Sequence, residues 1–249
     1  MTGEGALRAL AARFWQEAGG PAPLPRDVAR AALYVLPISI VYPARLSVGV
    51  VRAWLAARGI AVPLAGPDRL LRGCLVAHRG AALLLVDGQD PPEEQRFTVA
   101  HEVAHFLLEH QGPRERARRR LGPGALEVLD GLRGSTVGEQ VDALLADVAL
   151  RVRTHLLDRS PSGGPACGTA LRAECRADRL ALELLAPAPE VWTRLGNAPL
   201  RPFEALVARA ADLLMETFGL PGAIATAYAR HLALARTGGP SVREWLGLP

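Results

Sequence analysis

The spacing of apolar residues along the chain predicts a mostly helical protein with one short stretch of strands. Apolar positions recur every three to four residues in segments that we expect to be helices, namely residues 1–20, 28–36, 48–58, 95–110, 138–157, 169–185, 203–218 and 223–236. Residues 74–78 and 82–87 are short apolar runs on either side of Arg79-Gly80-Ala81, which is typical of a β-hairpin. The pattern therefore indicates the α+β class, mainly helical, with a small antiparallel sheet.

Prolines and glycines divide this pattern into three parts. We expect a helical extension over residues 1–46, a core over residues 47–187, and a C-terminal helical region over residues 188–249. A Gly-Leu-Pro-Gly break between two helices gives the last part a helix-turn-helix-like character. Within the core, residues 111–170 read as an insert that begins with a basic, solvated loop at residues 113–124.

Charge, cysteine content and hydropathy restrict the class of protein only mildly. The formal net charge is +4, and the sequence contains Arg but no Lys. This charge permits an acidic partner without requiring nucleic acid, so we do not expect direct nucleic-acid binding. Cys74, Cys167 and Cys175 form no disulfide framework, and the N-terminal stretch lacks the apolar core of a signal peptide, so we expect a cytoplasmic protein. The most apolar segment, residues 31–44, is shorter than the about 20 residues that a membrane span needs.

Residues 96–110, RFTVAHEVAHFLLEH, carry the strongest chemical signal in the chain. On a helix, His101 and His105 leave the same strip one turn apart, opposite an apolar stripe that includes Val103. Two imidazoles at this spacing can bind one ion, and Glu102 is placed to reach a water molecule on that ion. This is the HExxH arrangement of metallopeptidases, with two His ligands and a Glu general base.

A tetrahedral catalytic zinc site needs a third protein ligand, and the predicted helix at residues 169–185 offers one. Glu174 and Asp178 share a face of this helix beside an apolar stripe, whereas Glu183 is expected to face solvent. We expect Glu174 to bind the metal and Asp178 to hold the outer N–H of a ligand histidine. Two alternatives stay open: Cys175 as the third ligand, or Glu174 and Asp178 as mere partners of nearby arginines.

The remaining histidines carry weaker signals. His78 follows a strand and reads as a surface residue, His110 suits the negative C-terminal end of a helix, and His155 falls in the insert. Tyr228 and His231 lie three positions apart on a late helix and could donate to an oxyanion, although a surface pair is the simpler interpretation.

Two blocks, QRFTVAHEVAHFLLEH and ECRADRLALELLAP, resemble the ImmA/IrrE family of bacterial metallopeptidases. The resemblance implies a gluzincin-type, zincin-like core, with zinc as the cofactor and manganese as the alternative. It matches His101, His105 and Glu174 to the metal ligands and Glu102 to the general base. The resemblance covers roughly residues 47–236 and is strong only in the two blocks.

The family resemblance also implies a function. We expect an endopeptidase that cleaves a helix-turn-helix transcriptional repressor in a stress or mobile-element response. One alternative is a DNA-binding regulator with a structural metal site, for which the RERARRR stretch could contact phosphates. Another is a metal-binding protein that binds its partner without cleaving it.

Overall fold

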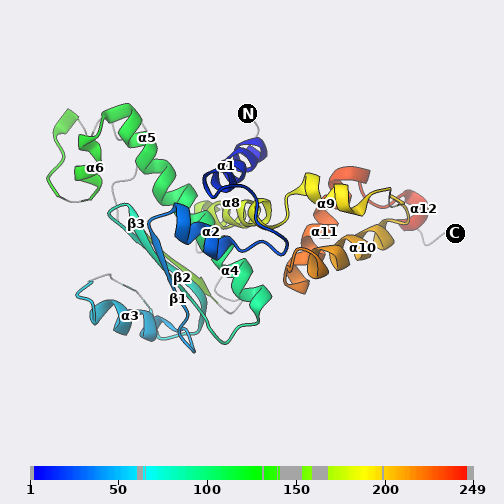
Figure 1. Ribbon diagram of the computed structural model, residues 1–249, viewed down its shortest axis with the longest axis horizontal. Helices are drawn as coiled ribbons and strands as arrows, with labels where there is room; N and C mark the ends of the chain where they lie inside the picture. Colours follow the sequence, from blue (N-terminus) through cyan, green and yellow to red (C-terminus); the bar gives the residue numbers. More distant parts are fainter. Residues whose placement is uncertain are drawn as a thin grey trace.

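The computed structural model describes residues 3–60, 64, 66–130, 132–138, 140, 153–158, 168–197 and 199–245. These residues form a four-stranded sheet with helices packed on both faces, and further helices extend from one end (Figure 1). In their order across the sheet, the strands are β1 (Ile38–Val41), β3 (Ala81–Val86), β2 (Leu71–His78) and β4 (Arg153–Asp158). The chain is therefore α+β and mainly helical, as predicted.

The hairpin predicted between β2 and β3 is confirmed. The two strands pair antiparallel, with His78 opposite Ala81. Arg79 and Gly80 form the connection and have φ angles of 49° and 81°. Two consecutive residues at positive φ match the right-handed twist of the strands that they join, and Gly adopts this conformation without a steric cost.

The prediction of a purely antiparallel sheet is wrong, because β1 runs parallel to β3. The sequence pattern gave no sign of β1, since Pro37 and Pro43 flank it and interrupt every periodic pattern. Proline is tolerated beside an edge strand, where its missing N–H faces no partner. The Pro37 carbonyl indeed accepts a hydrogen bond from the Ala82 amide at 3.0 Å, which extends the pairing beyond the strand.

The helix predicted at residues 138–157 is wrong over its last part. Residues 153–158 form β4, which pairs antiparallel with β2. Residues 141–152 lie outside the described residues. The short apolar segment fits either state, and the exposed edge of β2, far away in the sequence, decides between them by offering backbone partners.

The described helices are α1 (Gly3–Glu17), α2 (Val28–Val35), α3 (Val48–Ala56), α4 (Pro92–His105), the π-helix η1 (Phe106–Gln111), α5 (Gly112–Leu121), α6 (Gly124–Leu129), α8 (Gly168–Leu185), α9 (Ala188–Leu195), α10 (Phe203–Glu216), α11 (Gly222–Thr237) and α12 (Val242–Trp245). α4 begins at Pro92, earlier than predicted, because proline fits the first turn of a helix. Among the described residues, no helix combines the length and the apolar character needed to cross a membrane.

The sheet has two buried faces with different partners. On β2, Leu75 and Ala77 pack in the large core cluster with α4, whereas Cys74 and Val76 alternate with them and pack in the cluster with α3. This alternation follows from the period of two in a strand. α8 packs alongside α4, and α1 packs on α8. Since α4 also contacts β2 and β3, it lies between the sheet and α8.

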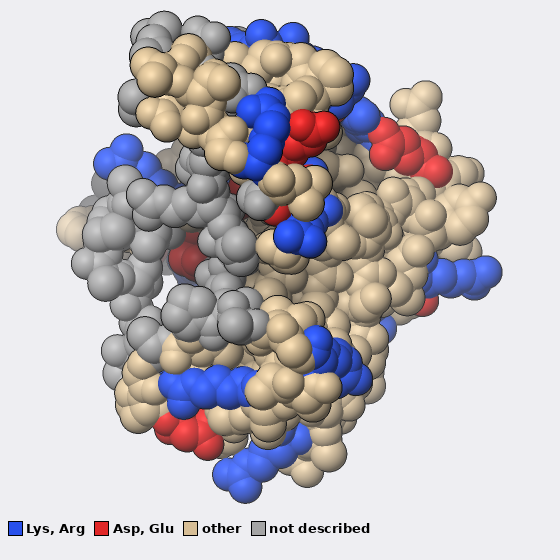
Figure 2. Space-filling model, turned by 90° about the vertical axis from the view of Figure 1, so that its left-hand side faces the viewer, with Lys and Arg blue, Asp and Glu red and all other residues tan. Residues whose placement is uncertain are grey.

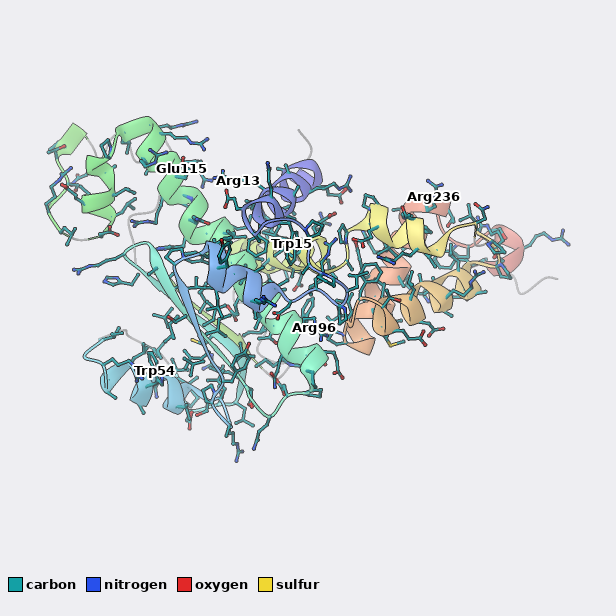
Figure 3. All side chains as sticks on the ribbon, in the orientation of Figure 1. Arg13, Trp15, Trp54, Arg96, Glu115 and Arg236 are labelled. Carbon is teal, nitrogen blue, oxygen red and sulfur yellow. The ribbon has the colours of Figure 1, made fainter. Side chains whose placement is uncertain are left out.

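Long-range hydrogen bonds connect α1 with α8, and α4 with the C-terminal helices. The Trp15 indole of α1 donates to the Leu184 carbonyl at 3.1 Å, and Arg96 of α4 donates to the Gly219 carbonyl between α10 and α11 at 2.8 Å (Figure 3). Both bonds bridge segments far apart in the sequence. The large core cluster accordingly runs from α1 through α8 to α11.

The basic stretch after α4 was predicted to be a loop and is a helix instead. In α5, Glu115 accepts hydrogen bonds from Arg118 and Arg119, three and four positions on, and Ala117 is buried against α6. These i,i+3 and i,i+4 pairs stabilise a helix despite its many like charges. α5 and α6 project beyond the sheet, and arginines are visible over this end of the molecule (Figure 2).

Candidate metal centre

α4 is buried on all sides in its second half. It packs on β2 and β3, on α2 and on α8, and every residue from Phe97 to His105 is buried. His101, Glu102 and His105 are 2%, 0% and 1% exposed. Polar side chains buried this deeply are costly unless they have partners, so their arrangement calls for a specific explanation.

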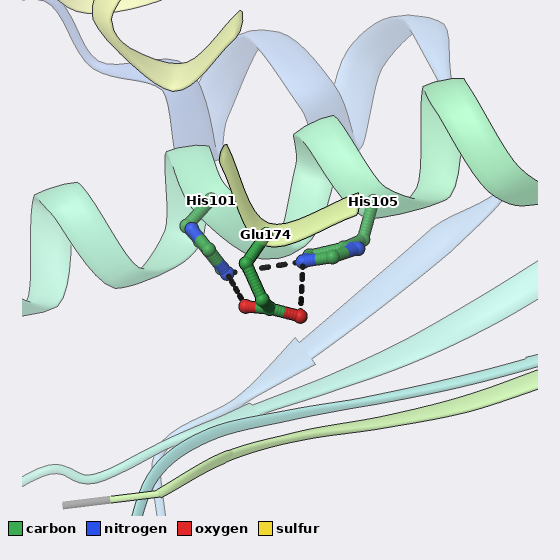
Figure 4. A group of neighbouring side chains, drawn as sticks. All are labelled: His101, His105 and Glu174. Atoms are coloured by element: carbon green, nitrogen blue, oxygen red, sulfur yellow. Dashed lines mark hydrogen bonds and ion pairs between the residues drawn. The ribbon is translucent and has the colours of Figure 1, made fainter. Parts of the chain in front are cut away.

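Three side chains from α4 and α8 converge on one point (Figure 4). The Nε2 atoms of His101 and His105 are 3.1 Å apart. Glu174 reaches in from α8, with Oε2 at 3.4 Å from the His101 Nε2 and Oε1 at 3.6 Å from the His105 Nε2. Each residue can offer one donor atom such that all three atoms lie within 4.8 Å of one another, which is close enough for one ion. Cys175 is exposed and is not a member of this group.

Each imidazole has a carboxylate at its outer nitrogen. The Nδ1 of His101 lies 2.9 Å from Asp178 Oδ1, and the Nδ1 of His105 lies 3.3 Å from Glu109 Oε1. When the His101 Nδ1–H donates to Asp178, the lone pair of this imidazole is on Nε2, the atom directed at the shared point. Glu109 approaches His105 at the distance of an ion pair. The Nε2 atoms of His101 and His105 lie at hydrogen-bond distance from each other, so either a proton or a metal ion can be shared at this point.

The charges around His101 favour a cation at this point. Burial lowers the pKa of His101, but the hydrogen bonds to Asp178 and Glu174 and the charge of Glu102 outweigh it and raise the pKa to about 9. The surroundings therefore stabilise positive charge strongly. Two imidazole nitrogens and a carboxylate are also a donor set of catalytic zinc sites. The residues present thus fit a divalent metal ion.

Glu102 occupies a space that a glycine on the sheet leaves open. A Cβ at Gly73 of β2 would lie 2.8 Å from Glu102 Oε1 and 2.6 Å from the Thr98 Cγ2. Side-chain atoms essentially never approach a Cβ this closely, so the carboxylate fits here because residue 73 has no side chain. β2 is also irregular at this point, with a register shift against β4 between Leu71 and Gly73. The sequence analysis did not single out Gly73.

The helix changes its geometry directly after the second histidine, which the sequence pattern did not reveal. Residues Phe106–Gln111 form a π-helix, a feature that is frequent at functional sites. Glu109 lies in this segment and approaches His105, a role that sequence analysis missed although its spacing of four residues was visible. The chain continues into α5, so His110 is not at a helix end as predicted; it is buried and stacks on Phe106 with ring centroids 5.3 Å apart.

The other candidates from the sequence lie outside this group. The Tyr228 hydroxyl donates to the Ala186 carbonyl at 3.1 Å, and His231 stacks on the Tyr228 ring. His78 is exposed at the end of β2, and residue 155 lies in β4 rather than in a helix. Cys167 lies outside the described residues.

Comparison with known proteins supports the resemblance seen in the sequence. Residues 69–126 match the model of the IrrE N-terminal-like domain, the peptidase M78 family, which supports an ImmA/IrrE family member. The matched segment contains β2, β3 and all of α4 but ends before Glu174. No curated protein and no solved structure matches the chain significantly. The family match suggests a metallopeptidase role.

Proposed function

Since residues 69–126 match the model of the IrrE N-terminal-like domain, we propose that the chain is a metal-dependent endopeptidase of the ImmA/IrrE family. The observation that carries the proposal is the approach of Glu174 to the two histidines of α4. The matched segment supplies His101 and His105, and Glu174, which lies outside it, approaches both imidazoles.

His101, His105 and Glu174 would hold the ion, which we propose to be zinc, with manganese as the alternative. A divalent cation held there supplies Lewis acidity toward a water molecule and toward the carbonyl oxygen of a peptide bond. Burial holds both imidazoles in place, and the hydrogen bond to Asp178 fixes the orientation of the His101 ring. Asp178 thereby positions His101.

Glu102 acts as the general base in this proposal. Its carboxylate is fully buried against Gly73 and lies near enough to His101 for its charge to raise the pKa of that imidazole. It would take a proton from the attacking water and pass it to the departing amine, so that the peptide bond breaks with no net change of proton number. A carboxylate with so little space to move is well oriented for both transfers.

The substrate that we propose is a protein, in particular a helix-turn-helix repressor, whose cleavage would release genes of a stress or mobile-element response. This part rests on the resemblance to the ImmA/IrrE family. A cytoplasmic location would suit such a partner. The competing idea of a DNA-binding regulator is weakened by α5, where Arg114 pairs with Asp130 and both Arg118 and Arg119 pair with Glu115.

The test is co-expression of the chain with a helix-turn-helix repressor from the same genome, followed by purified reactions with added zinc or manganese. We expect cleavage by the wild type, and a loss of roughly 100-fold or more in Glu102→Gln, which keeps the shape of the side chain. Glu93→Gln on the same helix is the matched control and should cleave normally. Zinc binding without cleavage of the repressor by the wild type would refute the endopeptidase proposal.

A further inference from the structure

A pocket that includes Asp178 in its wall lies next to the proposed metal centre, and residues of α1, α4, α8, α9 and α11 line it. Its volume is about 370 Å³, which is within the range of sites for small molecules. The rings of Phe97, Trp192 and Tyr228 contribute to its walls, together with aliphatic side chains of α8 and α11. The pocket can therefore enclose an apolar group of modest size.

One carboxylate in this pocket is mostly buried, and one of its oxygens has no hydrogen-bond partner among the described residues. Glu183 was expected to face solvent, but α1 covers it and leaves its side chain only 14% exposed. The Arg8 Nε lies 3.7 Å from Glu183 Oε1, whereas Oε2 is buried and has no hydrogen-bond partner among the described residues. The Tyr228 hydroxyl cannot help, because its hydrogen points to the Ala186 carbonyl.

A buried oxygen without a donor costs free energy that a suitable ligand would recover. Burial also raises the pKa of the Glu183 carboxyl, which a neighbouring cation would counteract. The required group is thus a hydrogen-bond donor with positive charge.

The charge balance of the pocket favours the same sign. The described lining contains three acidic residues, Glu4, Asp178 and Glu183. It contains two arginines, Arg8 and Arg179. Each arginine already lies 3.7 Å from a carboxylate, Arg8 from Glu183 and Arg179 from Glu4. With His231 of the lining counted as neutral, the pocket is therefore net negative, and an anionic ligand would have to displace an existing ion pair.

We propose that this pocket is a binding site for a small organic amine with an apolar or aromatic body. The ammonium group brings three N–H donors and would bond Glu183 Oε2. The apolar body would lie among Phe97, Trp192 and Tyr228, whose ring faces also attract a cation.

Binding has a consequence for the metal centre, and this consequence rests on the proposed function. Asp178 lines the pocket and accepts the hydrogen bond of the His101 Nδ1 at 2.9 Å, while 51% of its side chain is exposed. A cation bound beside Asp178 partly neutralises the negative charge that Asp178 places next to His101, and it repels a second cation nearby. The amine therefore lowers the affinity for zinc, and zinc lowers the affinity for the amine by the same factor.

Calorimetric titration of the full chain with 2-phenylethylamine tests the site directly, with 3-phenylpropionate and 2-phenylethanol as anionic and neutral analogues. We expect the amine to bind at least about tenfold more tightly than either analogue, because only it forms a charge-assisted bond with Glu183. Glu183→Gln should remove this preference, and Ile224→Trp should fill the pocket and abolish binding of all three. Glu127→Gln on the surface of α6 is the control and should bind normally.

The titration separates the failure of this proposal from that of the proposed function. Three results would overturn the amine site, independently of the result for zinc binding. They are equal binding of amine and propionate, no binding of the amine, and an unchanged preference for the amine in Glu183→Gln. Zinc is then titrated with and without saturating amine. If saturating amine leaves the zinc affinity unchanged, the coupling is refuted but the amine site is not. If the chain binds no zinc at all, the result counts against the metal centre alone.

Discussion

α4 and α8 contribute to the candidate centre in opposite ways. α4 presents His101, Glu102 and His105 from a strip that is buried on every side, between the sheet and the helices α2 and α8. α8 presents Glu174 and Asp178 from the edge of its packed face, where their side chains are 27% and 51% exposed. One helix thus holds its chemistry inside the core, and the other brings carboxylates to the rim.

This difference in burial indicates which half of the centre is fixed by folding. The polar groups of α4 cannot leave their places without disturbing the core, so they are preorganised at a cost in stability. The carboxylates of α8 have solvent beside them and can adjust, so their approach depends on what they bind. Each prediction below tests this division between a rigid and an adjustable half.

The largest effect is expected when one ligand is removed from each half. Glu174→Ala should weaken zinc binding by more than about 100-fold, beyond the effect of losing a merely supporting group, while the unfolding free energy without metal changes by less than about 0.5 kcal/mol. His105→Ala should weaken binding similarly but also destabilise the chain by roughly 1–3 kcal/mol, because it leaves a buried cavity. Chelator competition and urea unfolding measure the two quantities. Cys175→Ala is the control, and a comparable loss of zinc in that variant would restore the exposed thiol as the third ligand.

A change on the sheet should disturb the rigid half without touching a proposed ligand. Gly73→Ala would push on Glu102 and on Thr98, so we expect a destabilisation of roughly 1–3 kcal/mol and a fall in cleavage of about tenfold or more, with zinc affinity nearly unchanged. Adding Thr98→Ser removes the Cγ2 atom that the new methyl group meets at 2.6 Å. The double variant should regain stability but not cleavage. Full recovery of cleavage would show that Gly73 serves packing and not the placement of Glu102.

The two supporting carboxylates should differ in importance. Asp178→Asn and Glu109→Gln should each weaken zinc binding by roughly 10- to 100-fold, because each side chain orients an imidazole. The effect of Asp178→Asn should be the larger, because Asp178 Oδ1 lies 2.9 Å from the His101 Nδ1, whereas Glu109 Oε1 lies 3.3 Å from the His105 Nδ1. Zinc titration of both variants decides this order. No loss in either would mean that the tautomers are fixed by burial alone.

The smallest effect concerns local opening when the metal is removed. Without zinc, amide hydrogen exchange should increase in the first turns of α8 around Glu174, whereas residues Phe97–His105 of α4 should stay protected. Exchange measured by mass spectrometry with and without a chelator tests this. Equal loss of protection in both helices would contradict the division into a rigid and an adjustable half.

The sequence allowed some of these features to be predicted because they are local. The hairpin followed from its turn residues, and the helical spacing of His101 and His105 placed both imidazoles on one strip. The features that were missed depend on distant partners or on small departures from regular geometry. β4 needs the edge of β2, and α5 needs the ion pairs of Glu115 and the contact with α6.

The side chains that α4 directs toward the centre could be identified from the sequence, because a spacing of four residues fixes their direction within one helix. The sequence also offered Glu174 and Asp178 on one face of a second helix. Only the tertiary structure decided that these two strips meet, that Glu109 approaches His105 through a π-helix, and that Gly73 makes room for Glu102. The physical reason is that such contacts depend on how the core packs α4 between the sheet and α8, and no local pattern of residues encodes that distance.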